Sequence, residues 1–114
     1  MSNFEVKITT DSNEIREAQR LRFQVLNLEM NKGLQASYAR GLDCDDFDSI
    51  CDHLIVRDLK SQEVVGTYRL LLGSQAQRNL GFYSEREFNL QNIKKLGGEL
   101  LELGRSCARK DFRD

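Results

Sequence analysis

The sequence contains no proline and no tryptophan, and it has only one histidine and three cysteines. Three unevenly spaced cysteines are too few for a disulfide framework, which excludes the small disulfide-rich scaffolds. No apolar run approaches the roughly 18 residues that a membrane span needs, so an integral membrane protein is excluded as well. Because no proline-rich linker, repeat or low-complexity tract divides the chain, we expect residues 1–114 to belong to one domain.

An excess of charge of either sign is also absent. Seventeen lysines and arginines against 18 aspartates and glutamates leave a formal net charge of -1. The chain therefore has no overall positive field that attracts nucleic acid, and we expect no nucleic-acid partner. The start of the chain, MSNFEVKITT, lacks the basic and apolar regions of a signal peptide, which favours a cytoplasmic protein with reduced thiols.

Hydrophobic spacing predicts a strand followed by an amphipathic helix in the first part of the chain. Apolar and polar residues alternate over residues 4–10, as in a half-buried strand. Over residues 11–30 the apolar residues recur at helical spacing, with Ser12 or Asn13 as the N-cap. Residues 31–52 show no sustained period, so we expect a long, mobile connection without regular structure.

The remainder of the chain predicts three more strands. Residues 53–58 and 63–73 flank a polar turn and indicate an antiparallel hairpin. Residues 73–90 have the composition of a loop, residues 89–98 predict a short helix closed by glycines, and residues 99–108 predict a fourth strand. This order indicates an α/β fold built on a mainly antiparallel sheet.

Residues 43–53, DCDDFDSICDH, contain five aspartates, two cysteines and the only histidine. A calcium loop of the EF-hand type is excluded, because Asp48 stands where such a loop needs glycine. A solvated acidic loop remains open. The other interpretation is a pocket in which Asp45, Asp46 and Asp48 hold a cationic amine through charge-assisted hydrogen bonds.

The cysteines and the histidine raise two further alternatives. Cys44, Cys51, His53 and Cys107 are possible zinc ligands, although their spacing lacks the tight pairs of structural zinc sites. A cysteine hydrolase would use Cys51 and His53, but the sequence gives no signal for the third group that orients such a pair.

Three other segments place charged or aromatic residues on or beside predicted strands. Arg69 is a single charge in an otherwise uncharged strand, so an acid must face it. Glu102 and Arg105 would project to opposite faces of a regular strand, unless Gly104 allows a bulge between them. Residues 81–85, GFYSE, put two aromatics in a polar loop, a candidate lid or pocket wall. On residue chemistry alone, a structural ion-pair network is the more common explanation for Arg69, Glu102 and Arg105.

Six segments in order carry a resemblance to a known family: LRFQV (21–25), DCDDFD (43–48), CDHLIV (51–56), VGTYRLL (65–71), GFYSEREFNL (81–90) and ELGRSC (102–107). They resemble the ornithine N-acyltransferases of ornithine-lipid synthesis, a hemolysin-like group within the GNAT superfamily that is related to the acyl-homoserine-lactone synthases. The resemblance implies a GNAT-like α/β fold with a mainly antiparallel central sheet flanked by helices. Because that family continues past the fourth strand, we expect the chain to be the N-terminal part of a longer domain, with an exposed edge that favours a homodimer.

The resemblance also implies site residues. The matching positions are Arg22 on the helix, Asp45 and Asp48 of a D-x-x-D segment, Arg69 of a G-x-x-R-L motif, Phe82 of the following loop, and Glu102 and Arg105 of an E-x-x-R pair. The phenylalanine of the helix motif is adjacent to the arginine, at Phe23, rather than farther along. The tryptophan typical of the lactone synthases is missing, which favours the ornithine-type relatives.

The implied activity is transfer of a fatty acyl group, 3-hydroxyacyl in this resemblance, to the amine of ornithine or a similar amino acid. The donor is the phosphopantetheine thioester of acyl carrier protein, or acyl-CoA, and the resemblance implies neither a tightly bound cofactor nor a metal. Glu102 is the expected catalytic proton acceptor, positioned by Arg105 and by Arg69. Arg22, Arg69 or Arg105 would pair with Asp45 and Asp48, which hold the amine substrate or order the loop around it.

Two other functions remain open at this point. One is an acyl-homoserine-lactone synthase that takes S-adenosylmethionine as acceptor, and the other is a non-catalytic module that binds acyl carrier protein. We also expect peripheral membrane contact, because a lipid-like product has to leave toward the bilayer.

Overall fold

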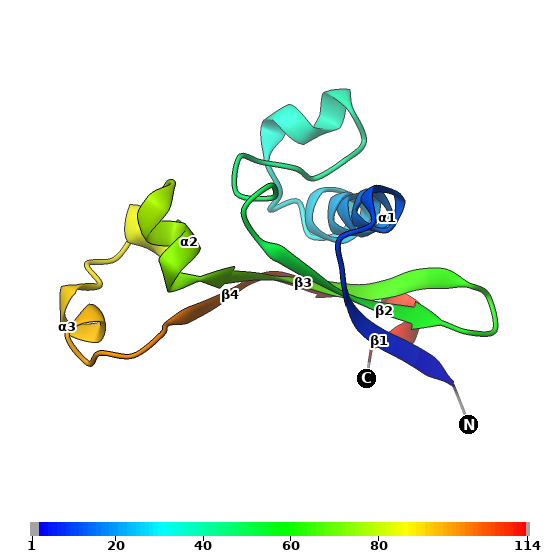
Figure 1. Cartoon of the computed structure of the whole chain (residues 1–114). Helices are drawn as coiled ribbons and strands as arrows, with labels where there is room; N and C mark the ends of the chain where they lie inside the picture. Colours follow the sequence, from blue (N-terminus) through cyan, green and yellow to red (C-terminus); the bar gives the residue numbers. More distant parts are fainter. Residues whose placement is uncertain (1–2, 114) are drawn as a thin grey trace.

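A computed structural model describes residues 3–113, which form a four-stranded sheet in the order β1-β2-β3-β4 with every pair antiparallel (Figure 1). The strands are β1 (Phe4–Thr9), β2 (Asp52–Asp58), β3 (Glu63–Leu72) and β4 (Leu101–Ala108). The four predicted strands and the predicted β2–β3 hairpin are therefore confirmed. Alternating side chains give each strand one face toward the core and one away from it.

Helix α1 (Ser12–Arg22) covers one face of this sheet and continues into a π-helical segment, η1 (Phe23–Glu29). The predicted cap is wrong by one residue, because the Asp11 side chain accepts the N–H of Glu14 at 2.9 Å. Ala18, Leu21 and Val25 on the inner side of the helix pack against Ile55 and Val64 of the sheet. This contact is the first of two apolar cores.

The connection from α1 to β2 is more ordered than its sequence predicts. It contains a 3₁₀-helix, η2 (Gln35–Ala39), and the backbone N–H of Asp43 donates to the Gln19 carbonyl at 3.0 Å. Phe47 has only 1% of its surface exposed. The expectation of a segment without regular structure is wrong at η2, and the acidic stretch is held against α1 and the sheet.

Residues 73–100 leave the sheet between β3 and β4 and project at one end of it (Figure 1). They contain α2 (Gly73–Arg78), the 3₁₀-helix η3 (Tyr83–Arg86) and α3 (Gln91–Lys94). The predicted short helix is α3, whereas α2 and η3 fall where a loop is predicted. The second core explains α2, because Ala76 packs there with Phe47, Leu71 and Phe82.

The face of the sheet opposite α1 carries exposed apolar side chains. Val6, Ile8 and Leu103 expose 61%, 52% and 62% of their surface. Val6 and Ile8 pair with Val56 and Leu54 of β2, so their side chains share one face. The 3₁₀-helix η4 (Lys110–Phe112) meets this face at one strand, where the Phe112 and Phe4 rings lie 5.9 Å apart, and α1 lies on the other side of the sheet (Figure 1). None of the helices within residues 3–113 has the length and apolar character of a membrane span.

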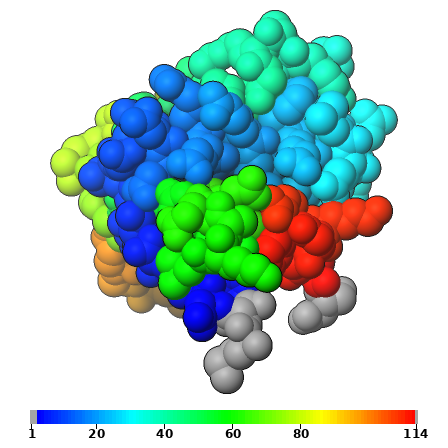
Figure 2. Space-filling view, turned by 90° about the vertical axis from the view of Figure 1, so that its right-hand side faces the viewer, coloured from blue at the N-terminus to red at the C-terminus, as the bar shows by residue number. Residues whose placement is uncertain are grey.

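Ion pairs connect the tip of the β2–β3 hairpin to α1 on one side and to Arg109 on the other. In Figure 2 the hairpin tip lies between α1 and the C-terminal residues. Arg57 reaches Glu14 at 3.0 Å and Glu17 at 3.4 Å on α1, and Arg109 reaches Glu63 at 2.5 Å. Lys7 of β1 adds a contact to Glu14 at 2.8 Å.

Candidate active site

Three arginines from three elements converge on the acidic stretch at the centre of the molecule. Arg22 ends α1, Arg69 lies on β3 and Arg105 lies on β4. The side chains of Arg22 and Arg69 expose only 1% and 4% of their surface. The prediction that an acid must face Arg69 is confirmed, since charges this buried require partners.

Each aspartate of the network has arginine partners. Asp43 Oδ2 lies 2.9 Å from Arg22 Nε and 3.1 Å from Arg105 Nε, and the other Asp43 oxygen accepts Arg105 Nη2. Asp48 Oδ2 lies 2.8 Å from Arg22 Nη2, and Asp48 Oδ1 lies 3.2 Å from Arg69 Nη1. Asp45 Oδ1 lies 2.6 Å from Arg69 Nη1. The predicted pairing of Asp45 and Asp48 with arginines is confirmed.

Charge compensation keeps Asp48 and Arg69 ionised despite their burial. Burial acts to raise the pKa of Asp48, but the hydrogen bond and charge of Arg22 outweigh it and hold that pKa below its ordinary value. Burial acts to lower the pKa of Arg69, but Asp45 and Asp48 leave it raised overall. Asp48 and Arg69 therefore both stay charged at neutral pH.

A β-bulge brings Arg105 into the site. The register of β3 against β4 shifts by one residue between Thr67 and Arg69. Arg105 has a φ of 51°, in the left-handed region that costs a residue with a Cβ about 1 kcal/mol. As predicted for the strand around Gly104, the bulge re-aims one side chain, and Glu102 and Arg105 line the same cavity.

The contacts of Glu102 differ from the prediction. Glu102 Oε1 accepts the N–H of Tyr83 at 2.7 Å, and Oε2 accepts the N–H and the hydroxyl of Ser84 at 2.9 and 2.5 Å. The prediction that Arg105 and Arg69 position Glu102 is wrong, because those guanidinium groups bind aspartates instead. Glu102 joins β4 to η3.

An aromatic pair forms one wall beside the arginines. The rings of Phe47 and Tyr83 meet edge to face with centroids 5.2 Å apart. The Arg69 guanidinium lies 5.7 and 5.6 Å from the two centroids, and that of Arg86 lies 4.9 and 5.2 Å from them. The expected aromatic wall is therefore present as Tyr83, while Phe82 packs into the second core.

Two small cavities meet at Glu102 and Ser84. One, the charged cavity, of about 180 Å³, has Arg69, Glu102 and Arg105 as its charged groups in a wall that is otherwise largely apolar and includes Phe47, Leu71, Tyr83, Ser84 and Leu103. The other, also of about 180 Å³, is mainly apolar and is lined by Phe82, Ser84, Leu90, Ile93, Leu100, Leu101 and Glu102. Ser84 and Glu102 line both.

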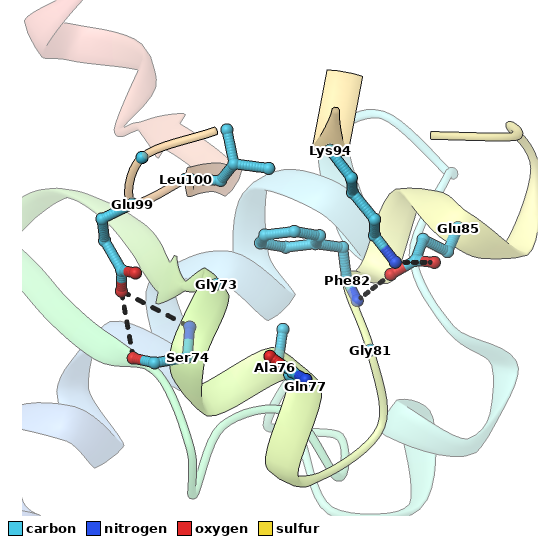
Figure 3. A pocket seen from close by; sticks show the side chains of 11 residues that line it. Gly73, Ser74, Ala76, Gln77, Gly81, Phe82, Glu85, Lys94, Glu99 and Leu100 are labelled. Atoms are coloured by element: carbon cyan, nitrogen blue, oxygen red, sulfur yellow. Dashed lines mark hydrogen bonds and ion pairs between the residues drawn. The ribbon is translucent and has the colours of Figure 1, made fainter. Parts of the chain in front are cut away.

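A larger cavity of about 540 Å³ lies between α2, η3, α3 and residues 98–100, which lead into β4 (Figure 3). Figure 3 shows the Phe82 ring near its centre and two polar pairs at its sides. In one pair the Ser74 hydroxyl donates to Glu99 at 3.0 Å, and in the other Lys94 binds Glu85 at 2.8 Å. None of the predicted charged site residues lines this cavity.

The cysteines and the histidine do not form a reactive centre. Burial raises the pKa of Cys51 and of Cys107 to about 11, so both are thiols at neutral pH. The buried His53 donates from Nε2 to the Asp48 carbonyl at 2.9 Å. Within residues 3–113 no group of three or more histidine, cysteine or acidic side chains is arranged to hold a metal.

Asp43 and Ser84 are the residues that sequence reasoning missed. The arginine count held a signal for Asp43, because two buried arginines and the half-buried Arg105 need more acid than Asp45 and Asp48 supply. No such signal existed for Ser84, whose partner Glu102 lies 18 residues away in the chain.

The antiparallel sheet with α1 on one face and a bulged fourth strand defines an acyltransferase-type α/β fold, and residues 21–114 match the family model described as "Acetyltransferase (GNAT) domain". The chain belongs to this family, and the predicted GNAT-like fold is confirmed. Two solved structures have a similar fold. The AHL synthase LasI superposes with a TM-score of 0.63 at 19% sequence identity, over 96% of this chain and 55% of its own. FeeM, an N-acyl amino acid synthase from uncultured soil microbes, superposes with a TM-score of 0.66 at 14% identity, over 97% of this chain and 56% of its own.

More specific relatives are two proteins named L-ornithine N(alpha)-acyltransferase. The one from Brucella abortus is 40% identical over 99% of this chain and 43% of its own length. The one from Rhodobacter capsulatus is 37% identical over 97% of this chain and 45% of its own length. The resemblance predicted from the six segments is thereby confirmed, and the chain spans less than half the length of these curated relatives.

Proposed function

We propose that the chain is part of an N-acyltransferase that moves a fatty acyl group from a thioester to the amine of ornithine or a similar amino acid. The observation that carries this proposal is that Glu102 and Ser84 line both a charged cavity and an apolar one. The two substrates of such a reaction, a cationic amino acid and an acyl chain, need these two environments side by side. The names of the relatives support the choice of acceptor.

The amine substrate fits the charged cavity. The acids in and beside it, Asp43, Asp45, Asp48 and Glu102, are matched in number by Arg22, Arg69, Arg86 and Arg105. Glu102 is the acid of this group that accepts hydrogen bonds from Tyr83 and Ser84 rather than from an arginine, so its carboxylate is the one we propose to attract the ammonium group. Asp48 has both oxygens occupied by Arg22 and Arg69, so of its two expected roles the ordering of the loop is the one we propose.

The acyl donor fits the outer edge of β4. Among the described residues this strand pairs only with β3, so its other edge has backbone groups free to bind the amides of a pantetheine arm. The apolar cavity beside Leu100 and Leu101 suits the acyl chain. A 3-hydroxyacyl group on acyl carrier protein is the donor that the family resemblance favours, with acyl-CoA as the other source of the thioester.

The reaction follows from these positions. After the bound ammonium group has lost one proton to solvent, the neutral amine attacks the thioester carbonyl. The C–N bond forms, the C–S bond breaks, and the carrier leaves as a thiolate that takes a proton from solvent. Glu102 accepts the proton that the amine loses. A backbone N–H of β4 stabilises the oxyanion, a contribution of about 3 kcal/mol for one donor in other acyl-transfer enzymes. The raised thiol pKa values fit this direct mechanism, because it uses no cysteine nucleophile.

Mass spectrometry of the product tests this proposal. This chain, and a protein that contains it at the length of its relatives (the family-length protein), are incubated with acyl carrier protein that bears a long 3-hydroxyacyl group and with ornithine. An ornithine amide from the family-length protein supports the proposal. A lactone from S-adenosylmethionine instead, or carrier binding without any product, would replace it with a lactone synthase or a binding module. Cytoplasmic location, membrane contact and a homodimer remain predictions.

A further inference from the structure

The Ser84 side chain makes the shortest of three hydrogen bonds that hold Glu102. Its hydroxyl donates to Glu102 Oε2 at 2.5 Å, and its N–H donates to the same oxygen at 2.9 Å. The Tyr83 N–H donates to Oε1 at 2.7 Å. Hydrogen bonds to an ionised acceptor are roughly twice as strong as neutral ones, so these three bonds fix the orientation of the carboxylate, and the Ser84 hydroxyl makes the shortest of them.

These bonds leave Glu102 little freedom to accept anything else. A carboxylate has about four lone-pair positions, and three donors take three of them. The position left is on Oε1, the oxygen that Ser84 does not touch. Because Ser84 binds Oε2 twice, it prevents the carboxylate from rotating and keeps this Oε1 lone pair in one direction.

The location of the pair connects it with the chemistry. Ser84 and Glu102 line the charged cavity together with Arg69, Tyr83 and Arg105, and they also line the apolar cavity. Both residues are half-buried, so solvent has limited access to the bonds between them. The pair thus lies where the amine and the acyl carbonyl of the proposed reaction have to meet.

We propose that Ser84 is a positioning residue for the acyl transfer, which orients Glu102 so that its free Oε1 lone pair meets the acceptor amine. The inference rests on the proposed function. In the transfer step the amine proton passes to Glu102 Oε1 as the C–N bond forms and the C–S bond breaks, and Ser84 keeps its own proton. Ser84 therefore acts only through Glu102.

A double-mutant cycle in the family-length protein tests this dependence. Ser84→Ala is expected to lower kcat about tenfold, with less than about a twofold change in the KM of the acyl donor, as for the loss of an interaction that matters in the transition state. In a Glu102→Gln background the same substitution should cost less than about twofold, because the group that Ser84 orients is gone. Ser84→Thr keeps the hydroxyl and should retain most of kcat.

The chain offers a matched control in Ser74, whose hydroxyl donates to the carboxylate of Glu99 at 3.0 Å in the larger cavity (Figure 3). Ser74→Ala should leave kcat unchanged. If Ser84→Ala does not fold, Ser84→Cys keeps the shape with a weak donor and should show the same loss of kcat.

Two results would overturn the inference while the proposed function stands: kcat of Ser84→Ala equal to that of the wild type, or a tenfold loss that persists in the Glu102→Gln background. If the wild-type family-length protein makes no amide, the proposed function and this inference fail together.

Discussion

Asp48 shows what single residues contribute to the site, because one carboxylate joins two buried guanidinium groups from different elements. Removing one partner of a buried pair leaves an uncompensated charge, which costs far more than the pair contributes. The acidic stretch therefore acts as a structural part of the site, in addition to any contact with substrate.

Asp48→Asn should lower the free energy of unfolding by about 3 kcal/mol, because Arg22 and Arg69 would share too little negative charge. It should also reduce acyl transfer at least tenfold. Denaturant unfolding and the amide assay measure the two effects. The control is Asp46→Asn, at an exposed position of the same stretch, for which both values should stay near those of the wild type. Wild-type stability and turnover for Asp48→Asn would contradict the role given to Asp48.

Cys51 and Cys107 should react slowly with iodoacetamide in the folded protein at pH 7.5, since a pKa of about 11 leaves almost no thiolate. Alkylation followed by mass spectrometry measures this, with urea-unfolded protein as the control that reacts fully. Rapid modification that also abolishes acyl transfer would contradict the direct mechanism and support a cysteine nucleophile.

At the scale of elements, the strands and α1 could be predicted because each buries one face, which leaves a period of two or of 3.6 in the sequence. Helix α2 could not be predicted in this way. It buries only Ala76, and its helical form depends on contacts with Phe47, Leu71 and Phe82, which lie far from it in the chain. The apolar spacing of η1, the π-helical continuation of α1, is that of an α-helix, so the sequence could not distinguish the two.

The candidate site, like the elements, was predictable only in part. A buried arginine needs an acidic partner, so the pairing of Arg69, the single charge in its strand, could be predicted from charge alone. The geometry of Glu102 could not, because it depends on how far η3 folds back over β4. Residue type predicted which groups meet, while loop conformation decided which pairs form.

The bulge in β4 predicts an unusual order of stability for two substitutions. Arg105→Gly and Arg105→Ala both lose the ion pair with Asp43, but glycine tolerates the φ of 51° and alanine does not. We expect the glycine variant to be more stable by about 1 kcal/mol in denaturant unfolding. The control is the exposed Ser106, whose φ is not positive: there the Ser106→Ala variant should be more stable than the Ser106→Gly variant. The same order at both positions would argue against backbone strain at Arg105.

The ion pairs around Glu14 connect α1 with β1 and β2 and make stability depend on pH. Hydrogen bonds from Lys7, Thr9 and Arg57 lower the pKa of Glu14 from 4.5 to about 2. A lowered folded-state pKa contributes stability above pH 4.5 that is lost as the pH falls toward 2. The difference in unfolding free energy between wild type and Glu14→Gln should therefore shrink over that interval. A difference that does not change with pH would contradict this assignment.

At the scale of the whole molecule, α1 covers one face of the sheet, whereas the other face keeps apolar side chains exposed beside the contact of Phe112 with Phe4. Val6, Ile8 and Leu103 lie exposed on the face away from α1. An apolar surface that spans several strands is a site of association. The free edge of β4 adds unpaired backbone groups beside it.

The isolated 114-residue chain should accordingly associate with itself in a concentration-dependent manner, measured by sedimentation velocity. Ile8→Lys and Leu103→Lys should each shift the chain toward monomer, because a charge is costly to bury in the contact. Leu28→Lys, at an exposed apolar position on η1, is the control and should leave association unchanged. A monomer at all concentrations would contradict this use of the exposed face.

The acids of the network come from one short segment, whereas its arginines come from α1, β3 and β4. Such an arrangement has a kinetic consequence. All the arginine partners of the aspartates are in place together only when the helix has docked on the β3–β4 pair, so we expect the complete network to form late in folding. Substitutions at Asp43 or Asp48 should then accelerate unfolding and hardly slow folding. A chain that has folded without this segment in place would have its sheet and helix but no site.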